Sequence, residues 1–408
     1  MTVETKDRLR IAMVAGCLGV GGAEKQLVLA VRSLREAGVD VKVYSLTQGE
    51  SHESCLQQLG LAPVWLGRHR VPRLFRLSKE VLQFRPHVIQ AGHTFANFYV
   101  GLVGRLLQVI SLGAMRTELA EELSTHGSRR TRLLIRLPHV LLTNSETALH
   151  GVRATNLKKP SCLFHLANAI SLRDHDSSED CGETNPKQSP QAIFVGNLVP
   201  NKKRLDIFLR ALSMACKRVP TLTGTIVGDG PERKPMEKLA RELGFAPDQV
   251  TFLGQRKDVP ELLRRADMLV LCSDWEGTPN VVLEAMATRL PVTTTPAGDA
   301  AKVVQDGVTG YVVPFGDVEA MADCMVRLAE CSDLRHRFGE AGRRVVEANY
   351  SYETLAKRLL LIYRKVAEQR NNDSVRRVVE SHLNSMVTQT VRRCEQETLC
   401  AESVEKSS

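Results

Sequence analysis

The chain lacks paired cysteines. Its ten cysteines stand singly along 408 residues, and no two of them have C-x-x-C spacing: Cys17, Cys55, Cys162, Cys181, Cys216, Cys272, Cys324, Cys331, Cys394 and Cys400. Structural zinc sites and disulfide frameworks both need cysteines grouped in pairs, whereas single cysteines within apolar runs are typical of buried free thiols in a reducing compartment. We therefore expect a cytoplasmic protein without a structural metal.

The chain also lacks a charged-then-apolar leader, so no secretory signal is expected. Its most apolar long stretch, residues 98–115, is interrupted by Arg105, Gln108 and three glycines. This pattern predicts a helix followed by a buried strand rather than a membrane span. Hydrophobic residues make up 43% of the composition, which excludes global disorder, and the length allows two domains.

Excess positive charge is absent from the second half. Residues 1–170 contain 22 Lys and Arg against 12 Asp and Glu, whereas the remainder has 33 against 34. The basic residues of the first half concentrate in 69–79 and 129–136, where they alternate with Leu, Ile and Phe. Two interpretations stay open: contact with an anionic membrane surface, or ordinary solvated helix faces. No nucleic-acid-binding motif accompanies them, so we expect no nucleic-acid partner.

Short apolar runs alternate with amphipathic segments throughout the chain. Expected strands in the first half are Leu9–Ala15, Val41–Leu46, His87–Ala91, Val109–Leu112 and His139–Thr143. Expected strands in the second half are Ala192–Val195, Gly224–Val227, Thr251–Leu253, Met268–Cys272, Val292–Thr295 and Gly310–Val312. Such alternation predicts an α/β fold with mostly parallel sheets, each covered on both faces.

Composition also indicates the domain boundaries. The polar, acidic segment 173–190 reads as a linker between a domain at 1–172 and a second domain at 191–349. A final helix is expected at Tyr350–Glu368, within a segment 350–370 that is expected to cross back to the first domain. The tail 371–408 is polar and expected to be partly helical, with a helix of unidentified partner over Val375–Arg393.

The most informative segment is Ser273–Ala287, where Glu276 and Glu284 bracket a turn and the start of a helix. Thr278 can cap this helix, and Pro279 suits its first position because no N–H is lost there. The free N–H groups of Asn280 to Val282 would then form a seat for a phosphate. Carboxylates beside an anion site need other partners, and sugar hydroxyls fit them. The segment therefore indicates a nucleotide-sugar site.

The string E-G-x-P-N-x-x-x-E-A-M-A resembles the retaining GT-B glycosyltransferases of family 4, the glycosyl transferases group 1. That resemblance implies two Rossmann-like domains with mostly parallel sheets facing a central cleft. It implies that Glu284 holds the donor ribose hydroxyls and that Glu276 lies near the donor sugar and the departing phosphate. It extends donor binding to the intervening residues Gly277, Thr278, Pro279, Asn280 and Val281. The alternative without a ligand site is a solvated glutamate followed by an ordinary core helix. Two glutamates without the rest of the motif would favour that alternative.

Other segments match the same family. Lys202 falls at the position of a lysine that grips the donor pyrophosphate, whereas Asn197 replaces the more usual arginine and removes a bidentate donor. The glycines Gly21 and Gly22 resemble the family's G-G-A-E loop between donor and acceptor. Gln255 and Arg256 match a loop that lies against the nucleobase. Lys302 stands where a glutamate is common.

The acceptor side carries weaker signals. The stretch 110–118 lacks the histidine that many family members have there, so its polar residues Arg116 and Glu118 are the candidates, together with His93 and His126. Asp174-His175-Asp176 has the D-x-D spacing by which another glycosyltransferase fold binds metal, but it lies in the acidic linker. We interpret it as coincidence and expect no metal and no cofactor, so that Lys202 and helix N-termini would neutralise the leaving diphosphate.

The resemblance implies a glycosyltransferase that moves a sugar from a UDP-, GDP- or ADP-sugar to a glycan or lipid-linked acceptor with retention, with Lys202 and Glu276 as catalytic residues. Synthesis of a cell-surface polysaccharide or glycolipid is the expected role. Peripheral contact with the inner membrane face would suit the basic first half. Two alternatives stay open. One is a GT-B nucleotide-sugar epimerase with the same donor site. The other is a non-catalytic subunit, which is suggested by Asn197 and by the histidine that the acceptor side lacks.

Overall fold

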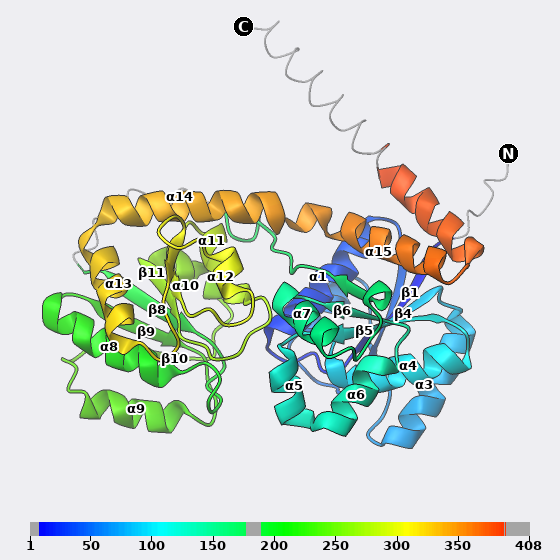
Figure 1. The fold of residues 1–408 in the computed structure, drawn as a ribbon, viewed down its shortest axis with the longest axis horizontal. Coiled ribbons are helices and arrows are strands. Elements are labelled where there is room, and N and C mark those ends of the chain that lie inside the picture. Colours follow the sequence, from blue (N-terminus) through cyan, green and yellow to red (C-terminus); the bar gives the residue numbers. More distant parts are fainter. Residues whose placement is uncertain (1–7, 177–188, 387, 389–408) are drawn as a thin grey trace, which may run out of the picture.

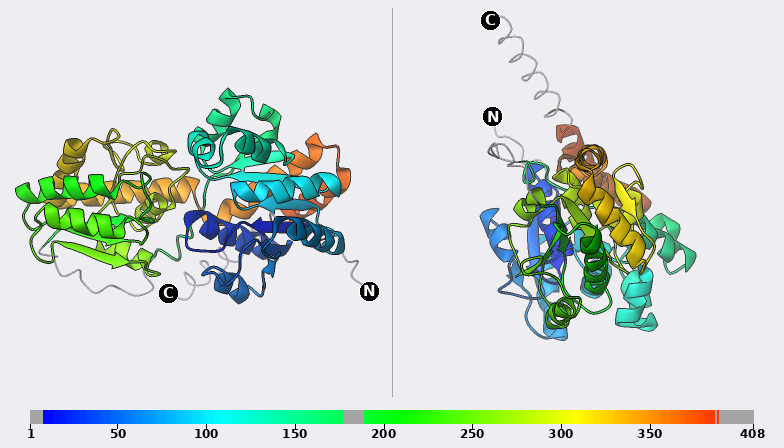
Figure 2. Two further views of the ribbon diagram at one scale, coloured as in Figure 1. Left: turned by 90° about the horizontal axis from the view of Figure 1, so that it is seen from below. Right: turned by 90° about the vertical axis from the view of Figure 1, so that its left-hand side faces the viewer.

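The computed structural model describes residues 8–176, 189–386 and 388, which form two α/β domains side by side along the long axis (Figures 1 and 2). Most of the expected linker at 173–190 and the end of the tail lie outside these residues. The strands of the first sheet are β1 (Arg10–Ala15), β2 (Asp40–Ser45), β3 (Val64–Trp65), β4 (Val88–Ala91), β5 (Ile110–Met115), β6 (Val140–Thr143) and β7 (Leu163–His165). Its helices are α1 (Gly22–Glu36), α2 (Glu53–Gln58), α3 (Arg70–Phe84), η1 (Thr94–Ala96), α4 (Asn97–Leu106), α5 (Leu119–His126), α6 (Ser128–Arg136), α7 (Glu146–Ala154) and η2 (Pro160–Cys162).

The first sheet is parallel and has the strand order β3-β2-β1-β4-β5-β6-β7. Side chains of β1 alternate between two cores because successive residues of a strand face opposite sides. Ile11 and Met13 pack with α1, whereas Ala12 and Val14 pack with α3 and α4. The strand order reverses between β1 and β4, which is where ligands bind in doubly wound sheets.

The second domain repeats this plan with a sheet in the order β10-β9-β8-β11-β12-β13. Its strands are β8 (Gln191–Val195), β9 (Thr223–Val227), β10 (Val250–Gly254), β11 (Met268–Leu271), β12 (Val292–Thr294) and β13 (Gly310–Val312). Its helices are α8 (Leu205–Arg218), α9 (Arg233–Glu242), α10 (Val259–Arg265), α11 (Asn280–Ala287), α12 (Ala300–Val303), α13 (Val318–Glu330) and α14 (Ser332–Asn349). Phe194 faces the core beneath α8 and α13, and Ile193 faces the core beneath α11, so both faces are covered.

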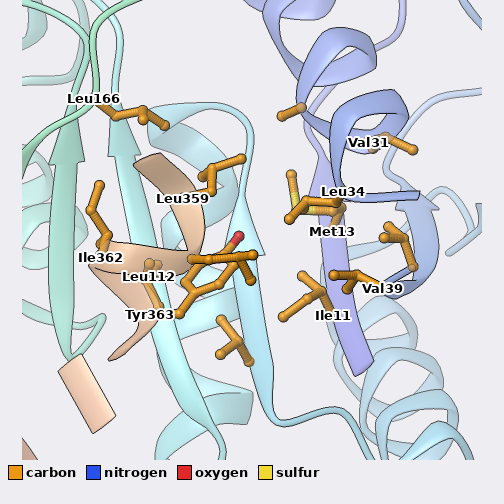
Figure 3. Packing of buried hydrophobic residues seen from close by; sticks show 14 of the residues in the cluster. Ile11, Met13, Val31, Leu34, Val39, Leu112, Leu166, Leu359, Ile362 and Tyr363 are labelled. Atoms are coloured by element: carbon orange, nitrogen blue, oxygen red, sulfur yellow. The ribbon is translucent and has the colours of Figure 1, made fainter. Parts of the chain in front are cut away.

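The chain returns to the first domain after α14, which runs along the second domain (Figure 1). The single helix expected at Tyr350–Glu368 is wrong at its start, because α14 ends at Asn349 and Ser351 forms a bridge with Ile170. A short helix η3 (Tyr352–Thr354) and then α15 (Leu355–Gln369) follow. Leu359, Ile362 and Tyr363 of α15 pack against β1, β5 and α1 in the first core (Figure 3).

The beginning of the tail is also part of the first domain. Residues 373–386 are helical, and Val375 and Val379 are fully buried in the core shared with α1 and α15. This core is the partner that the sequence left unidentified. Within the described residues, no helix combines the length and the apolar character that crossing a bilayer requires.

Candidate active site

The two domains meet through the loops that follow the carboxyl ends of their strands. On the first domain these are the loops after β1, β4, β5 and β6; on the second they follow β8, β11 and β12. Many hydrogen bonds cross between the two sets. Thr278 Oγ1 donates to the Asn144 carbonyl oxygen at 2.7 Å, for example, and a Cβ on Gly277 would lie 2.4 Å from the Arg116 carbonyl oxygen. Residue 277 must therefore be glycine for the domains to approach this closely.

Glu276 lies buried on the loop after β11. Its Oε1 accepts a hydrogen bond of 2.7 Å from Ser273 Oγ and lies 2.5 Å from Lys203 Nζ. The sequence did not single out Lys203 above its basic neighbours. Its ammonium nevertheless gives Glu276 a charged partner inside the cleft, which allows this carboxylate to be buried.

Glu284, on α11, contacts the first domain directly. Its Oε1 lies 2.6 Å from Lys25 Nζ, although the two residues are 259 positions apart. Lys25 follows the glycine loop at the start of α1, and this adjacency to Gly21 and Gly22 is the only sequence signal that could have indicated it. The pair places the second glutamate of the motif at the domain boundary.

Asn280 joins α11 to two segments of the first domain. Its Nδ2 donates to the Gly22 carbonyl oxygen at 2.8 Å, and its Oδ1 accepts from Asn168 Nδ2 at 2.8 Å and Gln26 Nε2 at 3.1 Å. A Cβ on Gly22 would lie 2.5 Å from Asn280 Nδ2, so the glycine permits this approach. The sequence does not indicate Asn168 or Gln26, because neither belongs to a motif.

The start of α11 differs from the expectation. The helix begins at Asn280 with Pro279 as its N-cap, and no side chain caps it. Thr278 is not the cap, because its hydroxyl bonds across the interface to Asn144 instead. The N–H of Val282 donates to the Pro279 carbonyl oxygen, which leaves the N–H groups of Asn280 and Val281 at the start of the helix. Two amides at a positive helix end still suit an anion.

Lys202 reaches the first domain. Its Nζ lies 2.5 Å from Oε1 of Glu121, a residue of α5 that no sequence motif indicates. Asn197 is exposed on the same loop after β8. A hollow of about 340 Å³ lies beside this loop, lined by residues that include Val199, Lys203 and Glu232.

His93, Glu24 and Cys17 form a buried network at the ends of β1 and β4. Cys17 Sγ lies 2.7 Å from Glu24 Oε1, and His93 Nε2 lies 3.2 Å from the same oxygen. Burial opposes ionisation of Glu24, but the bonds from His93 and Cys17 outweigh it and lower the pKa of Glu24 to about 2. Burial beside this carboxylate raises the pKa of Cys17 to about 12. His93 thus orients a carboxylate that follows Gly21.

These three side chains are the group in the described chain whose atoms are close enough to share a metal ion. The Gly16 N–H donates to His93 Nδ1 at 3.1 Å, so the proton of the neutral ring is on Nε2, the nitrogen that faces Glu24. A metal at Nε2 would require that proton to leave while Nδ1 remains an acceptor. The donor set therefore fits a hydrogen-bonded network better than a metal centre.

The other acceptor-side candidates separate into two places. Arg116 turns toward the Gly92 carbonyl oxygen, 3.3 Å from its Nε, and burial lowers its pKa to about 10. Glu118 reaches the second domain, where its Oε1 accepts from the Gly298 N–H at 2.8 Å. His126 lies 3.5 Å from Oε2 of Glu122, on the same helix as Glu121. Arg116 and Glu118 follow one strand; the Arg116 side chain turns into the first domain, whereas the Glu118 side chain reaches the second.

The remaining sequence candidates lie at the edge of the second domain or outside the cleft. Gln255 and Arg256 occupy an exposed loop after β10, and the Arg256 guanidinium holds Asp258 at 2.7 and 2.8 Å. Asp176 of the D-x-D segment pairs with Arg343 of α14 at 2.8 Å.

Comparison with known proteins supports one family. The profile described as glycosyl transferases group 1 matches residues 178–345, and the profile of glycosyltransferase family 4 matches residues 20–160. The chain is 31% identical to an alpha-D-kanosaminyltransferase of Streptomyces kanamyceticus over 74% of this chain and 81% of that protein. It is 34% identical to an N-acetyl-alpha-D-glucosaminyl L-malate synthase of Bacillus anthracis over 37% of this chain and 39% of that one.

A solved structure shows the same fold. The Anabaena protein HepE, crystallised with UDP-glucose, superposes with a TM-score of 0.77 at 18% identity, over 89% of this chain and 100% of that one. Two parallel sheets, the glutamate motif at the domain boundary and the match along most of the kanosaminyltransferase together identify the family of this chain. The chain belongs to family 4 of the GT-B glycosyltransferases, the glycosyl transferases group 1.

Proposed function

We propose that this glycosyltransferase moves a sugar from a nucleotide-sugar to a hydroxyl of a glycan or lipid-linked acceptor, with retention and without a metal. The observation that carries the proposal is that Lys202 and Glu284 both pair with residues of the first domain, Glu121 and Lys25, at the boundary where Glu276 and the uncapped start of α11 also lie. Together these groups offer an ammonium and amides for a diphosphate, and carboxylates for hydroxyls. The structurally similar HepE protein was crystallised with UDP and with UDP-glucose, which supports a nucleotide-sugar as the donor class.

In this proposal Lys202 stabilises the charge that grows on the diphosphate as the glycosidic bond breaks. A preorganised donor of this kind is commonly worth about 3 kcal/mol of barrier. The N–H groups of Asn280 and Val281 act on the same phosphate, and Glu284 accepts from the ribose hydroxyls. The resemblance to the family supports attack on the face that the leaving phosphate vacates, with that phosphate taking the acceptor proton. The bond from Lys203 would hold the Glu276 carboxylate in position beside the donor sugar.

Replacement of Lys202 by alanine tests the assignment. We expect turnover to fall by about 100-fold, the loss that corresponds to about 3 kcal/mol. The control is Lys217→Ala, which removes an exposed lysine of α8 from the same domain. Near-normal turnover of the Lys202 variant, with the fold intact, would refute the role.

Incubation with donor alone separates the alternative functions, because an epimerase returns an altered sugar nucleotide. A non-catalytic subunit would bind none of UDP, GDP and ADP in calorimetry.

A membrane-associated acceptor is favoured by one face of the first domain. Helix α4 packs against both α3 and α6, and these three helices carry exposed apolar side chains, including Phe75 and Leu133, which are 74% and 48% exposed. Exposed basic residues lie beside them: Arg76, Lys79, Arg129, Arg130, Arg132 and Arg136. Such a mixture suits an anionic bilayer surface.

Sedimentation with vesicles tests the membrane contact. We expect binding to vesicles with phosphatidylserine and little binding to phosphatidylcholine alone, because the basic residues need an anionic surface. Phe75→Asp should weaken binding, whereas Phe315→Asp, at an exposed phenylalanine of the second domain, should not. Equal sedimentation with both lipid compositions would contradict a peripheral location at the membrane.

A further inference from the structure

Helix α7 of the first domain begins with two backbone N–H groups that its own sequence does not satisfy. The first four N–H groups of a helix have no intrahelical partner. Ser145, the N-cap, accepts from the Ala148 N–H at 3.0 Å and so satisfies one of them. Of the other helical residues in this first turn, the N–H groups of Glu146 and Thr147 remain, at the positive end of the helix dipole.

Asp299, a residue of the second domain, satisfies both groups. Its Oδ2 accepts from the Glu146 N–H at 2.7 Å, and its Oδ1 accepts from the Thr147 N–H at 3.0 Å and from the Thr147 hydroxyl at 2.9 Å. Its side chain is almost fully buried. Lys302 adds an ion pair with Glu146, with 3.0 Å between Nζ and Oε2. We call these four residues the interdomain clamp.

The loop that carries Asp299 also contacts the Glu276–Gly277 turn of the glutamate motif. The Asp299 N–H donates to the Gly277 carbonyl oxygen at 2.9 Å, and the adjacent Gly298 N–H donates to Glu118. Gly298 has φ of +58°, and a Cβ there would lie 2.1 Å from the Gly277 carbonyl oxygen. The loop is therefore wedged between the first domain and the Glu276–Gly277 turn.

The clamp exists only when the two domains are this close. If the domains separated, the two N–H groups of α7 and the Asp299 carboxylate would lose their hydrogen bonds to one another. Water would then have to replace these charge-assisted bonds. The departure of Lys302 from the glutamate common at its position is consistent with this role, because a glutamate there would repel Glu146.

We propose that Asp299 is a positioning residue whose bonds to α7 hold the first domain against the Glu276–Gly277 turn during transfer. The inference rests on the proposed function, because it takes this turn to border the donor sugar. Asp299 itself touches neither substrate in this proposal. Its effect is to fix the position of the first domain, which binds the acceptor in this proposal, relative to the donor sugar on the second domain.

Amide exchange tests the contact itself, independently of chemistry. In Asp299→Ala we expect deuterium uptake to increase in a peptide that contains residues 145–150. The matched control is Asp317→Ala, because Asp317 caps α13 within the second domain by accepting from the Ala320 N–H at 2.9 Å. That variant should raise exchange at α13 only. Unchanged uptake at the start of α7 in Asp299→Ala would overturn the proposal.

Steady-state kinetics tests the positioning role. We expect kcat of Asp299→Ala to fall about tenfold, the scale of losing cap-type bonds at a helix start. The dissociation constant for UDP should stay within about threefold, because Lys202, Glu284 and α11 remain. Asp299→Asn, which keeps one acceptor oxygen, should retain an intermediate kcat. An unchanged kcat, or an equal loss in UDP affinity, would contradict positioning. If no sugar nucleotide supports transfer by the wild-type chain, the proposed function fails, whereas the exchange result still decides whether the clamp forms.

Discussion

Lys202 Nζ lies 2.5 Å from Glu121 Oε1, so the cation assigned to the donor diphosphate is paired with a carboxylate of the other domain. Lys202 is about one-third exposed and Glu121 less, which leaves the pair accessible to a ligand. In the proposed function, a diphosphate that binds this ammonium would compete with the Glu121 carboxylate for its charge and N–H donors.

Glu121→Gln should lower the KM for the sugar nucleotide severalfold, because the neutral amide competes less well for Lys202. The control is Glu80→Gln, which breaks an ion pair with Lys42 inside the first domain, 2.8 Å between Nζ and Oε2. Initial rates at varied donor concentration would show the change. A raised KM in the Glu121 variant would indicate that this carboxylate instead helps to hold the donor.

Glu284→Gln should raise the donor KM by about tenfold to 100-fold, the range for losing hydrogen bonds to a charged group. The substitution also breaks the pair with Lys25, so Lys25→Met separates the two effects. We expect Lys25→Met to leave donor affinity within severalfold, since it removes a competitor of the ribose. Titration of UDP by calorimetry measures both variants. Equal losses in both would mean that the ion pair, not contact with the ribose, explains the effect.

Gly298→Ala should reduce both stability and activity, because the new Cβ meets the Gly277 carbonyl oxygen at a position with φ of +58°. Gly307→Ala is the matched control: its φ is +70°, but no atom lies within 4 Å of the added Cβ. The control should lose about 1 kcal/mol from backbone strain alone. Urea unfolding and initial rates would compare the two. If both variants behaved alike, the close contact between Gly298 and the Gly277 carbonyl oxygen would contribute nothing to stability or activity.

The sequence predicts the two sheets well because their central strands are apolar runs with polar or glycine boundaries. Strands β8 and β13, for example, begin within one residue of the expectation. It does not predict β3 and β7, the short strands at the two edges of the first sheet. The motif glutamates are visible because they share one turn and helix. Their partners Lys25 and Lys203 depend on folded geometry, and Lys25 also on how closely the domains approach. The same holds for Glu121 and Asp299, whose neighbours in the chain carry no signal of a partner across the cleft.

Glu122 gives the fold a pH dependence that can be measured. Burial raises the pKa of Glu122 to about 6, although the Thr94 hydroxyl, 2.5 Å from Oε1, partly opposes the shift. Because the folded pKa exceeds the usual 4.5, the folded chain binds the proton more tightly than the unfolded chain. The stabilising contribution is complete below pH 4.5 and is lost as pH rises through 6. A shift of this size corresponds to about 2 kcal/mol.

Glu122→Gln should remove that dependence, because glutamine does not titrate. We expect the difference in free energy of unfolding between this variant and the wild type to change by about 2 kcal/mol between pH 4.5 and pH 7.5, in favour of the variant at the higher pH. Urea unfolding at both pH values measures it. Glu330→Gln, at an exposed position that ends α13, should follow the wild type at both. Parallel behaviour of the two variants would show that the buried carboxyl group does not control this part of the stability curve.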